Sequence, residues 1–363
     1  MSSVPPRRPE STMHQYATLH RWLTAPMPSC LLAMTLLLTG CSAKSVEPVE
    51  LTGQTMGTSY SIKLAAAPDP TLQNTLQRQV EQRLHDINAQ MSTYLADSDL
   101  MRFNRNASTE WHAAPPDLVE LVEQANRISA QTDGMYDITV GPLVNLWGFG
   151  NAGPRAAAPP EQEVTALLKQ TGYQHLQTQR SPPALRKDVA GLQIDLSSIA
   201  KGWAVDQLAQ ILIDHGIRDF LVEIGGELRA SGRKAADRPW RVAIERPIDG
   251  YREVQRVIGL RDLAMATSGD YRNFFENGGR RFSHTISPKS GLPVQHRVAS
   301  VSVVADDCAQ ADAWATALMA LGEKRGPEVA ESLQLKALFI LRAPGGFEER
   351  ISPALRDSGI LGD

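Results

Sequence analysis

The chain has 363 residues, of which 42% are hydrophobic and 21% are charged, and its formal net charge at pH 7 is −3. This composition supplies enough apolar material for one large domain or two closely packed subdomains, and it excludes an intrinsically disordered chain. Because no long basic stretch accompanies the slightly acidic balance, it also excludes a protein that binds the phosphate backbone of nucleic acids.

The first forty residues have the layout of an export signal. Three arginines precede an apolar run over residues 31–38, which is much shorter than the roughly 20 residues of a membrane-spanning helix. Small residues precede Cys41 in Leu38-Thr-Gly-Cys41, which resembles the lipobox of bacterial lipoproteins. We therefore expect residues 1–40 to be a cleaved lipoprotein signal peptide and Cys41 to be the lipidated first residue of the mature chain.

Two alternatives to this interpretation use the same residues. The segment is either a soluble signal peptide with an incidental cysteine or, because of Arg7 and Arg8, a twin-arginine signal. The apolar residues expected just after a twin-arginine pair are missing, which argues against the second alternative. With Cys30 removed in the signal and Cys41 lipidated, Cys308 would remain as a buried apolar residue, and we expect no intramolecular disulfide.

The body of the chain follows a short polar tether at residues 41–50. Polar and apolar residues alternate from Ser59 to Leu64, as is typical of an edge strand. Apolar residues then recur at three- and four-residue steps, which predicts helices over residues 71–91 and 116–131, each with one buried face. A loop rich in proline, alanine and glycine is predicted at residues 151–160, with a further helix behind it.

The second half of the chain contains more strands than helices. The patterns predict strands at residues 192–196, 220–224, 240–245, 298–304 and 336–341, and helices over residues 199–215 and 309–321. Because paired helices come first and the strands cluster later, we expect an α+β body and not a regular β-α-β succession.

Two motifs suggest chemistries that their context argues against. Gly148-Phe-Gly150-Asn-Ala-Gly153 matches a dinucleotide-binding pattern by letter, but no hydrophobic strand leads into it and a proline follows. The segments Ser198-Ile-Ala-Lys201, Tyr271-Arg-Asn273 and Lys289-Ser-Gly291 occur in the order found in penicillin-recognising enzymes. The last of them stands between two prolines, which suits a turn better than the interior strand that this chemistry requires.

One predicted helix carries a candidate magnesium site. Asp312 and Thr316 lie four positions apart and therefore share a face of this helix. A carboxylate and a hydroxyl placed in this way offer two hard oxygen ligands of the kind that magnesium prefers. The structural alternative is that Asp312 lies near the helix start, where its charge is favourable, and that Thr316 bonds back to a helix carbonyl.

Polar residues of two other segments are further candidates. Asp195 ends a predicted buried strand, and Ser198 and Lys201 enter the following helix, at a place where ligand sites are common. His284 is a candidate general base, because histidine titrates near neutral pH. Each of these residues also has a structural alternative: Asp195 or Ser198 as a helix N-cap, Lys201 as a solvated helix residue, and His284 as a packed histidine.

Taken together, these segments resemble the ApbE family of FAD:protein FMN transferases, and the match is collinear from Thr55 to Thr316. The matching segments, in chain order, are Thr55–Thr58, Met91–Tyr94, Ser98, Arg102–Asn104, Gly134–Gly148, Asp195–Gly202, Gly225-Gly226, Thr267–Asp270, Ser283–Pro288 and Ala311–Thr316. Two positions depart from the family pattern: Ser287 stands where much of the family has aspartate, and Tyr136 stands where phenylalanine is frequent. We therefore assign no role to a carboxylate at position 287.

The resemblance implies the fold, the domain bounds and the site residues. The fold would be a body of mixed or antiparallel sheets packed with helices, with a catalytic domain over residues 51–345 and a C-terminal tail over residues 346–363. The residues implied to contact FAD are Met56, Tyr94, Met135, Tyr136, Asp137, Asp195, Lys201 and Ile286. The residues implied to coordinate magnesium, some of them through backbone oxygens, are Ser198, Asp312, Ala315 and Thr316. His284 corresponds to the family's histidine thought to deprotonate the acceptor, and Asp312 and Lys201 complete the implied catalytic set.

The activity implied by the resemblance is the magnesium-dependent transfer of FMN from FAD to a serine or threonine hydroxyl of an acceptor protein, with release of AMP. In the family, the acceptors are membrane redox proteins that carry a segment Asp-x-x-Ser/Thr-Gly-Ala-Thr. Two alternatives stay open: a magnesium-dependent FAD pyrophosphatase and a non-catalytic FAD-binding lipoprotein. A lipid anchor at Cys41 would hold the mature chain on the periplasmic side of a membrane, and we expect the inner membrane, although Ser42 is not the aspartate associated with retention there.

Overall fold

The computed structural model describes residues 49–150, 153, 155, 157–235, 237–271, 274–277 and 280–362. They belong to one unit of the chain, Val46–Asp363. The predicted signal peptide, the lipidation site Cys41 and most of the tether lie outside the described residues, as do parts of the loop at residues 151–160 and of Tyr271-Arg-Asn273. Within the described ranges, no helix is both long and apolar enough to cross a bilayer.

An eight-stranded antiparallel sheet forms the centre of this unit, with the strand order β1-β2-β6-β7-β10-β13-β14-β15. The strands are β1 (Val49–Thr55), β2 (Thr58–Leu64), β6 (Phe220–Ile224), β7 (Glu227–Ser231), β10 (Leu263–Gly269), β13 (Val298–Ala305), β14 (Lys336–Ala343) and β15 (Gly346–Ile351). Nearly every residue of β13 is buried, because structure covers both faces of the sheet at this strand.

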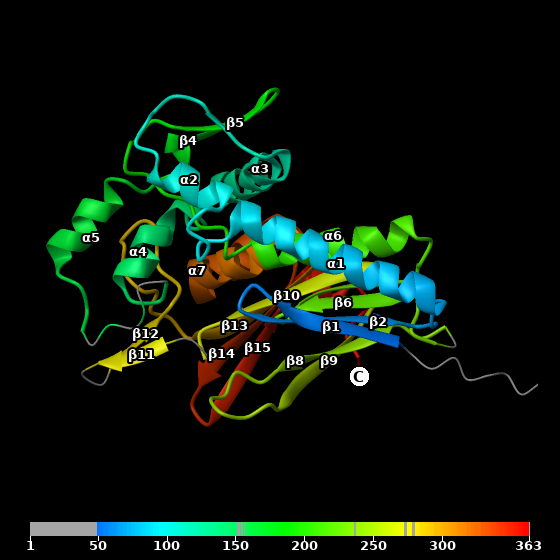
Figure 1. Cartoon of the computed structure of the whole chain (residues 1–363). Helices are drawn as coiled ribbons and strands as arrows, with labels where there is room; N and C mark the ends of the chain where they lie inside the picture. The colour runs from blue at the N-terminus through cyan, green and yellow to red at the C-terminus, as the bar shows by residue number, and fades with distance from the viewer. Residues whose placement is uncertain are drawn as a thin grey trace, which may run out of the picture. The chain divides into compact units, whose positions relative to one another are not determined.

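Helices cover one face of the main sheet. Figure 1 shows α1, α6 and α7 lying across this face, and α6 and α7 pack directly on the strands β6, β7, β10 and β13. The helices are α1 (Pro70–Met91), α2 (Asp99–Arg105), α3 (Pro116–Gln131), α4 (Gly141–Leu146), α5 (Glu161–Leu168), α6 (Ala200–Asp214), α7 (Cys308–Ser332) and α8 (Pro353–Arg356), with short 3-10 turns η1 (Ile138–Val140) and η2 (Tyr173–His175). Side chains such as Val80, Leu208 and Val222 form the apolar core between these helices and the sheet.

A hairpin of β8 (Trp240–Glu245) and β9 (Val254–Leu260) covers the other face. Trp240, Val242 and Ile244 alternate toward the main sheet and pack with Leu228 and Met265 in a second apolar core. Two smaller sheets complete the described structure: β3 (His112–Ala113), β5 (Pro183–Lys187) and β4 (Leu176–Arg180) form one, and β11 (Phe274–Asn277) and β12 (Arg280–Ser283) form the other. Helices packed on antiparallel sheets confirm the predicted α+β fold class.

Most of the predicted elements are present. The helices predicted over residues 71–91, 116–131 and 199–215 are α1, α3 and α6, within one residue at each end. The predicted strands after residue 215 correspond to β6, β8, β13 and β14. The helix predicted over residues 309–321 is only the first part of α7, which continues to Ser332 after the backbone turns at Gly322 with φ of 74°.

The strand predicted at residues 192–196 is wrong. These residues pair with no strand in the described part of the chain, because the side chain of Asn104 takes the place of a neighbour. The N–H of Ile194 donates to Asn104 Oδ1, and Asn104 Nδ2 donates to the oxygen of Ile194, each over 2.8 Å. The amide side chain of Asn104 thus bonds the backbone N–H and the backbone oxygen of Ile194, which a neighbouring strand would otherwise bond. The apolar pattern of a strand therefore occurs here outside a sheet.

The two edges of the main sheet also differ from the prediction. Residues 59–64 are predicted as an edge strand, but β2 lies inside the sheet because β1 pairs along its whole length. Residues 346–363 are predicted as a tail, but β15 pairs with β14 and forms the opposite edge, and α8 follows it. Alternation within a strand reports which side chains face a core, and it does not report whether another strand pairs alongside.

Candidate active site

A cleft of about 480 Å³ opens where α4, the start of α6, the β6–β7 turn, the end of β10 and one face of α7 meet. Most of the predicted site residues line this cleft, namely Tyr94, Met135, Tyr136, Asp137, Asp195, Ser198, Lys201, His284, Ile286, Asp312 and Thr316. Met56 and Ala315 are not among its lining residues: Met56 lies in the β1–β2 turn, and Ala315 is buried within α7. The fold therefore brings together segments that lie between Thr93 and Ala320 in the sequence.

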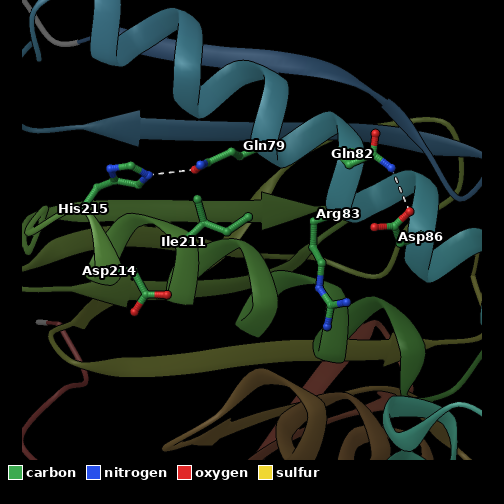
Figure 2. Close-up of a pocket in the computed structure, with 7 residues that line it drawn as sticks. All are labelled: Gln79, Gln82, Arg83, Asp86, Ile211, Asp214 and His215. Carbon is green, nitrogen blue, oxygen red and sulfur yellow. Dashed lines mark hydrogen bonds between the residues drawn. The ribbon is translucent and has the colours of Figure 1, made fainter.

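A second cavity, of about 360 Å³, lies between α1 and α6 (Figure 2). Four of its polar side chains bond in pairs: His215 Nε2 lies 2.7 Å from Gln79 Oε1, and Gln82 donates to Asp86 over 2.8 Å. It contains none of the predicted site residues. We place the candidate site in the larger cleft, where buried ionisable groups lie beside apolar walls.

One lysine and two buried carboxylates form the charged part of the cleft. Lys201 Nζ lies 2.9 Å from Glu227 Oε1 and 3.8 Å from Asp312 Oδ2. The backbone N–H of Gly202 donates to the same oxygen of Asp312 over 3.1 Å. Glu227 is 5% exposed and Asp312 is 4% exposed. One ammonium lies beside two carboxylates, so negative charges outnumber positive ones in this group. Its buried surroundings screen these charges poorly.

Burial shifts the protonation equilibria of this group. It raises the pKa of Asp312 and that of Glu227 above their usual ranges, while the nearby ammonium of Lys201 opposes both shifts. Burial by itself would lower the pKa of Lys201, but the two carboxylates outweigh it and raise that pKa. Lys201 therefore stays positively charged at working pH, and a further cation beside the carboxylates would restore the balance of charge.

The oxygen atoms in this part of the cleft fit a divalent cation. Asp312 supplies a carboxylate and Thr316 supplies a hydroxyl on the same face of α7. Glu227, whose Oε2 has no hydrogen-bond partner within the described ranges, adds negative charge beside these two ligands. No metal-binding cluster of three or more His, Cys, Asp or Glu side chains occurs among the described residues. Magnesium usually keeps several waters and binds substrate phosphates, so two protein oxygens are sufficient anchors.

Two hydroxyl pairs hold polar residues in the cleft wall. Ser198 Oγ donates to the hydroxyl oxygen of Tyr136 over 3.0 Å, and burial raises the pKa of Tyr136, so that its phenol stays neutral. Thr316 Oγ1 lies 3.0 Å from Ser268 Oγ at the end of β10. Thr316 is therefore held by the central sheet as well as by its own helix.

The carboxylate of Asp137 is used mainly to build the wall. Its Oδ1 accepts hydrogen bonds from the N–H and the hydroxyl of Thr139, over 2.8 Å and 2.7 Å, and its Oδ2 accepts one from the N–H of Tyr173 over 2.8 Å. These bonds cap η1 and join it to η2. A direct contact between Asp137 and FAD stays a prediction from the resemblance.

His284 lies on a segment that rests on a separate apolar cluster. The ring of Phe149 meets the ring of His284 edge-on, with centroids 6.3 Å apart and an interplanar angle of 69°. Trp147 Nε1 donates to the oxygen of Gly291 over 2.7 Å. Gly291 has φ of 67° and packs so closely that a β-carbon there would lie 2.5 Å from Val164. The position of His284 thus depends on α4 and α5, whose small core is distinct from the main one.

Sequence reasoning missed several residues of the cleft, above all Glu227 and Phe149. Glu227 directly follows the Gly225-Gly226 pair, and Phe149 directly follows the matched segment that ends at Gly148. The signal that could have identified Glu227 and Phe149 was therefore their position next to segments that match the family. No local pattern could have paired Glu227 with Lys201, because the two residues lie on different elements.

The structural context argues against both competing motifs. Ser198 bonds to Tyr136 and Lys201 bonds to Glu227, so the serine and the lysine of an acyl-enzyme site are each engaged elsewhere. Lys289 and Gly291 lie in a turn, and Lys289 pairs with Asp133 over 2.6 Å. The glycine pattern beginning at Gly148 follows the helix α4, and not the strand that a dinucleotide-binding turn requires.

Replacing Gly202 with alanine is expected to destabilise the fold near the site. A β-carbon at this position would lie 2.2 Å from the backbone oxygen of Cys308, because α6 and α7 approach each other closely there. We expect the unfolding free energy to fall by about 1–3 kcal/mol, as overpacking does elsewhere. Chemical denaturation measures the change. Gln210→Ala on the exposed face of α6 is the control, expected within about 0.5 kcal/mol of the parent. An unchanged unfolding free energy for the alanine variant would contradict the close packing.

Comparisons with known proteins agree with the geometry. A sequence model described as the ApbE family matches residues 56–339. The chain is 44% identical to the FAD:protein FMN transferase of Vibrio cholerae serotype O1, over 93% of this chain and 98% of that protein. It is 37% identical to the FAD:protein FMN transferase of Escherichia coli K12, over 90% of this chain and 95% of that protein.

Two solved structures are similar to the described fold. The flavin transferase ApbE from Vibrio cholerae has a TM-score of 0.79 and 44% identity, and the match covers 85% of this chain and 98% of that one. The apo form of the flavinyl transferase ApbE from Pseudomonas stutzeri has a TM-score of 0.79 and 40% identity, with coverages of 86% and 96%. Fold and sequence therefore indicate the same group of proteins.

Proposed function

The chain belongs to the ApbE family, and from this premise we propose that it transfers the FMN half of FAD to a serine or threonine hydroxyl of an acceptor protein. The proposal includes magnesium as cofactor and AMP as the second product. The observation that supports it most directly is the single cleft in which Lys201, Asp312, Thr316 and His284 meet.

The walls of the cleft support the binding of a flavin nucleotide. Apolar side chains that line it include Met135, Val140, Val144, Phe149 and Ile286. Tyr94 also lines the cleft and is 77% exposed, so its ring is accessible for stacking on a ring of the ligand. Apolar surfaces beside a charged end suit a molecule that combines flat rings with a pyrophosphate.

The proposed reaction is a displacement at phosphorus. The acceptor oxygen forms a bond to the FMN-side phosphorus of FAD, the bond from this phosphorus to the bridging oxygen breaks, and AMP leaves with that oxygen. His284 would accept the hydroxyl proton at a ring nitrogen, and Lys201 would bring a positive charge to the phosphate oxygens. Asp312 and Thr316, together with Ser198 and Ala315 according to the resemblance, would hold magnesium, which neutralises charge on phosphate oxygens when it is bound.

The test is a reaction of the purified protein with FAD, magnesium and a peptide that carries the segment Asp-x-x-Ser/Thr-Gly-Ala-Thr. The expected products are a flavin-labelled peptide and an equal amount of AMP. A peptide with alanine in place of the acceptor hydroxyl residue is the control and should stay unlabelled. Free FMN with AMP would instead indicate a pyrophosphatase, and unchanged FAD would indicate a binding protein.

We also propose that the mature chain is a lipoprotein anchored at Cys41, facing the periplasm on the inner membrane. The support is the apolar run that ends in Leu38-Thr-Gly-Cys41. Replacing Cys41 with serine is expected to move the protein from the membrane fraction to the soluble fraction. Separation of inner and outer membranes tests the location of the unaltered protein. A Cys41→Ser variant that stays in the membrane fraction would contradict the lipid anchor.

A further inference from the structure

The position of the Lys201 ammonium between two carboxylates is the starting point. It lies 2.9 Å from Glu227 Oε1 but 3.8 Å from Asp312 Oδ2, so it makes a hydrogen bond to Glu227 and only a longer ion pair with Asp312. The three residues lie on different elements: Lys201 on α6, Glu227 at the start of β7 and Asp312 on α7. The fold therefore offers this lysine two buried partners, and the lysine bonds to one of them.

The backbone around Glu227 fixes the position of this residue. Ile224 pairs with Glu227 across a two-residue turn, and both turn residues, Gly225 and Gly226, have positive φ, at 63° and 110°. A turn of this kind is the tight connection that suits antiparallel strands, and it needs residues without a β-carbon penalty. The Glu227 side chain is consequently anchored at the first position of a central strand, and from there its Oε1 bonds to Lys201.

An ammonium in direct contact with Asp312 would compete with a metal ion. A metal ion would bind to the lone pairs and the negative charge of the Asp312 carboxylate, and an ammonium in direct contact would occupy the same lone pairs and neutralise the same charge. This competition is strong because a buried site screens charge poorly. In the structure, the longer ion pair and the N–H of Gly202 both involve Oδ2 of Asp312, so Oδ1 makes neither contact. That arrangement leaves one carboxylate oxygen available to a cation.

We propose that Glu227 is a positioning residue, which holds the ammonium of Lys201 away from Asp312 and thereby keeps the Asp312 carboxylate available to a divalent cation. The inference rests on the proposed function, because it takes Asp312 as a metal ligand. It adds a task for a carboxylate that makes no metal contact of its own. The same bond would direct Lys201 toward the place of the substrate phosphates.

The test measures magnesium binding by calorimetry in the whole protein without FAD. Glu227→Gln removes the charge and keeps the shape, so Lys201 should move to Asp312, and we expect the affinity for magnesium to fall tenfold or more. Lys201→Met removes the competing cation, so its affinity should equal or exceed that of the parent. If Glu227 acts through Lys201, adding Glu227→Gln to Lys201→Met should cause no further loss of affinity.

A matched control keeps the overall charge comparable. Glu223→Gln removes a carboxylate from the neighbouring strand β6, outside the cleft, and it should change magnesium affinity by less than twofold. In transfer assays, the magnesium concentration for half-maximal activity should rise in Glu227→Gln and stay near that of the parent in Glu223→Gln. Damage to the fold alone would lower the amount of active protein without changing that concentration. Glu227→Asp, with the same charge on a shorter arm, serves as a second variant if the amide does not fold, and it should show an intermediate loss.

Three outcomes would overturn the proposal. An unchanged affinity in Glu227→Gln would remove its basis, and so would an equal affinity in Glu223→Gln and Glu227→Gln. A tenfold loss that persists in the Lys201→Met background would show that Glu227 contacts the ion directly. Asp312→Asn is measured alongside. If it binds magnesium as the parent does, the assignment of Asp312 as a magnesium ligand in the proposed function fails. If Asp312→Asn loses magnesium binding while Glu227→Gln keeps the affinity of the parent, only the inference about Glu227 is refuted.

Discussion

Asp312→Asn is expected to abolish magnesium-dependent AMP release and FMN transfer while leaving the fold intact. Asparagine has the shape of aspartate and keeps an oxygen for the N–H of Gly202, but it lacks the negative charge that would bind the cation. Metal-assisted stabilisation of transition-state charge is worth several kcal/mol, so the transfer rate should fall by a factor on the order of 10³ or more. Asp312→Ala should lose activity as well, and it also leaves Gly202 without its acceptor.

The control for this variant lies on the same helix. Asp307 caps the start of α7 by accepting a hydrogen bond from the N–H of Gln310 over 2.8 Å, and it does not line the cleft. Because asparagine caps helices as well as aspartate does, Asp307→Asn should keep both stability and activity. AMP release, followed by chromatography over a range of magnesium concentrations, is the measurement. Unchanged release by Asp312→Ala would remove Asp312 from the set of magnesium ligands.

His284→Ala is expected to bind FAD normally and to lose transfer. General base catalysis contributes factors of about 10² to 10⁴, so the rate should fall by roughly that amount. FAD affinity, measured by quenching of flavin fluorescence, should change little, because His284 would act on the acceptor hydroxyl and not on the nucleotide. Single-turnover labelling of the acceptor peptide measures the chemical step.

His215→Ala is the matched control for this experiment. His215 belongs to the second cavity between α1 and α6, where it bonds to Gln79 (Figure 2), and it does not line the cleft. This variant should transfer FMN at the rate of the parent. Full transfer activity in His284→Ala would exclude His284 as the base. A parallel loss of FAD affinity would show instead that His284 helps to bind the nucleotide.

The amino-acid sequence by itself determined the regular elements with strong periodicity. α1 and α3 have apolar residues at helical spacing along one face, and this signal is local because it depends only on positions within the same helix. The shared face of Asp312 and Thr316 follows from the same geometry. Most of the cleft residues were found through collinear segments that resemble a known family, since single residues such as Asp195 or His284 had equally good structural explanations.

Only the tertiary structure decided how distant segments satisfy one another. Asn104 makes a hydrogen bond to the N–H and another to the backbone oxygen of Ile194. Residues 192–196, which are predicted as a strand, are therefore bonded by this side chain and not by a neighbouring strand. β1 and β15 form the edges of the main sheet because they bond the backbone groups on the outer sides of their partners, β2 and β14. A backbone group must find a partner, but the sequence around it does not state which segment provides that partner.

In the charged part of the cleft, too, the sequence does not state which residues become partners. Lys201, Glu227 and Asp312 come from α6, β7 and α7, and their distances depend on how closely these elements pack. The close approach of α6 and α7 at Gly202 sets one side of this arrangement, and the tight turn before Glu227 sets another. Charge interactions act through space, so the sequence could name the ionisable groups, whereas the packing of the helices on the sheet determined which of them became partners.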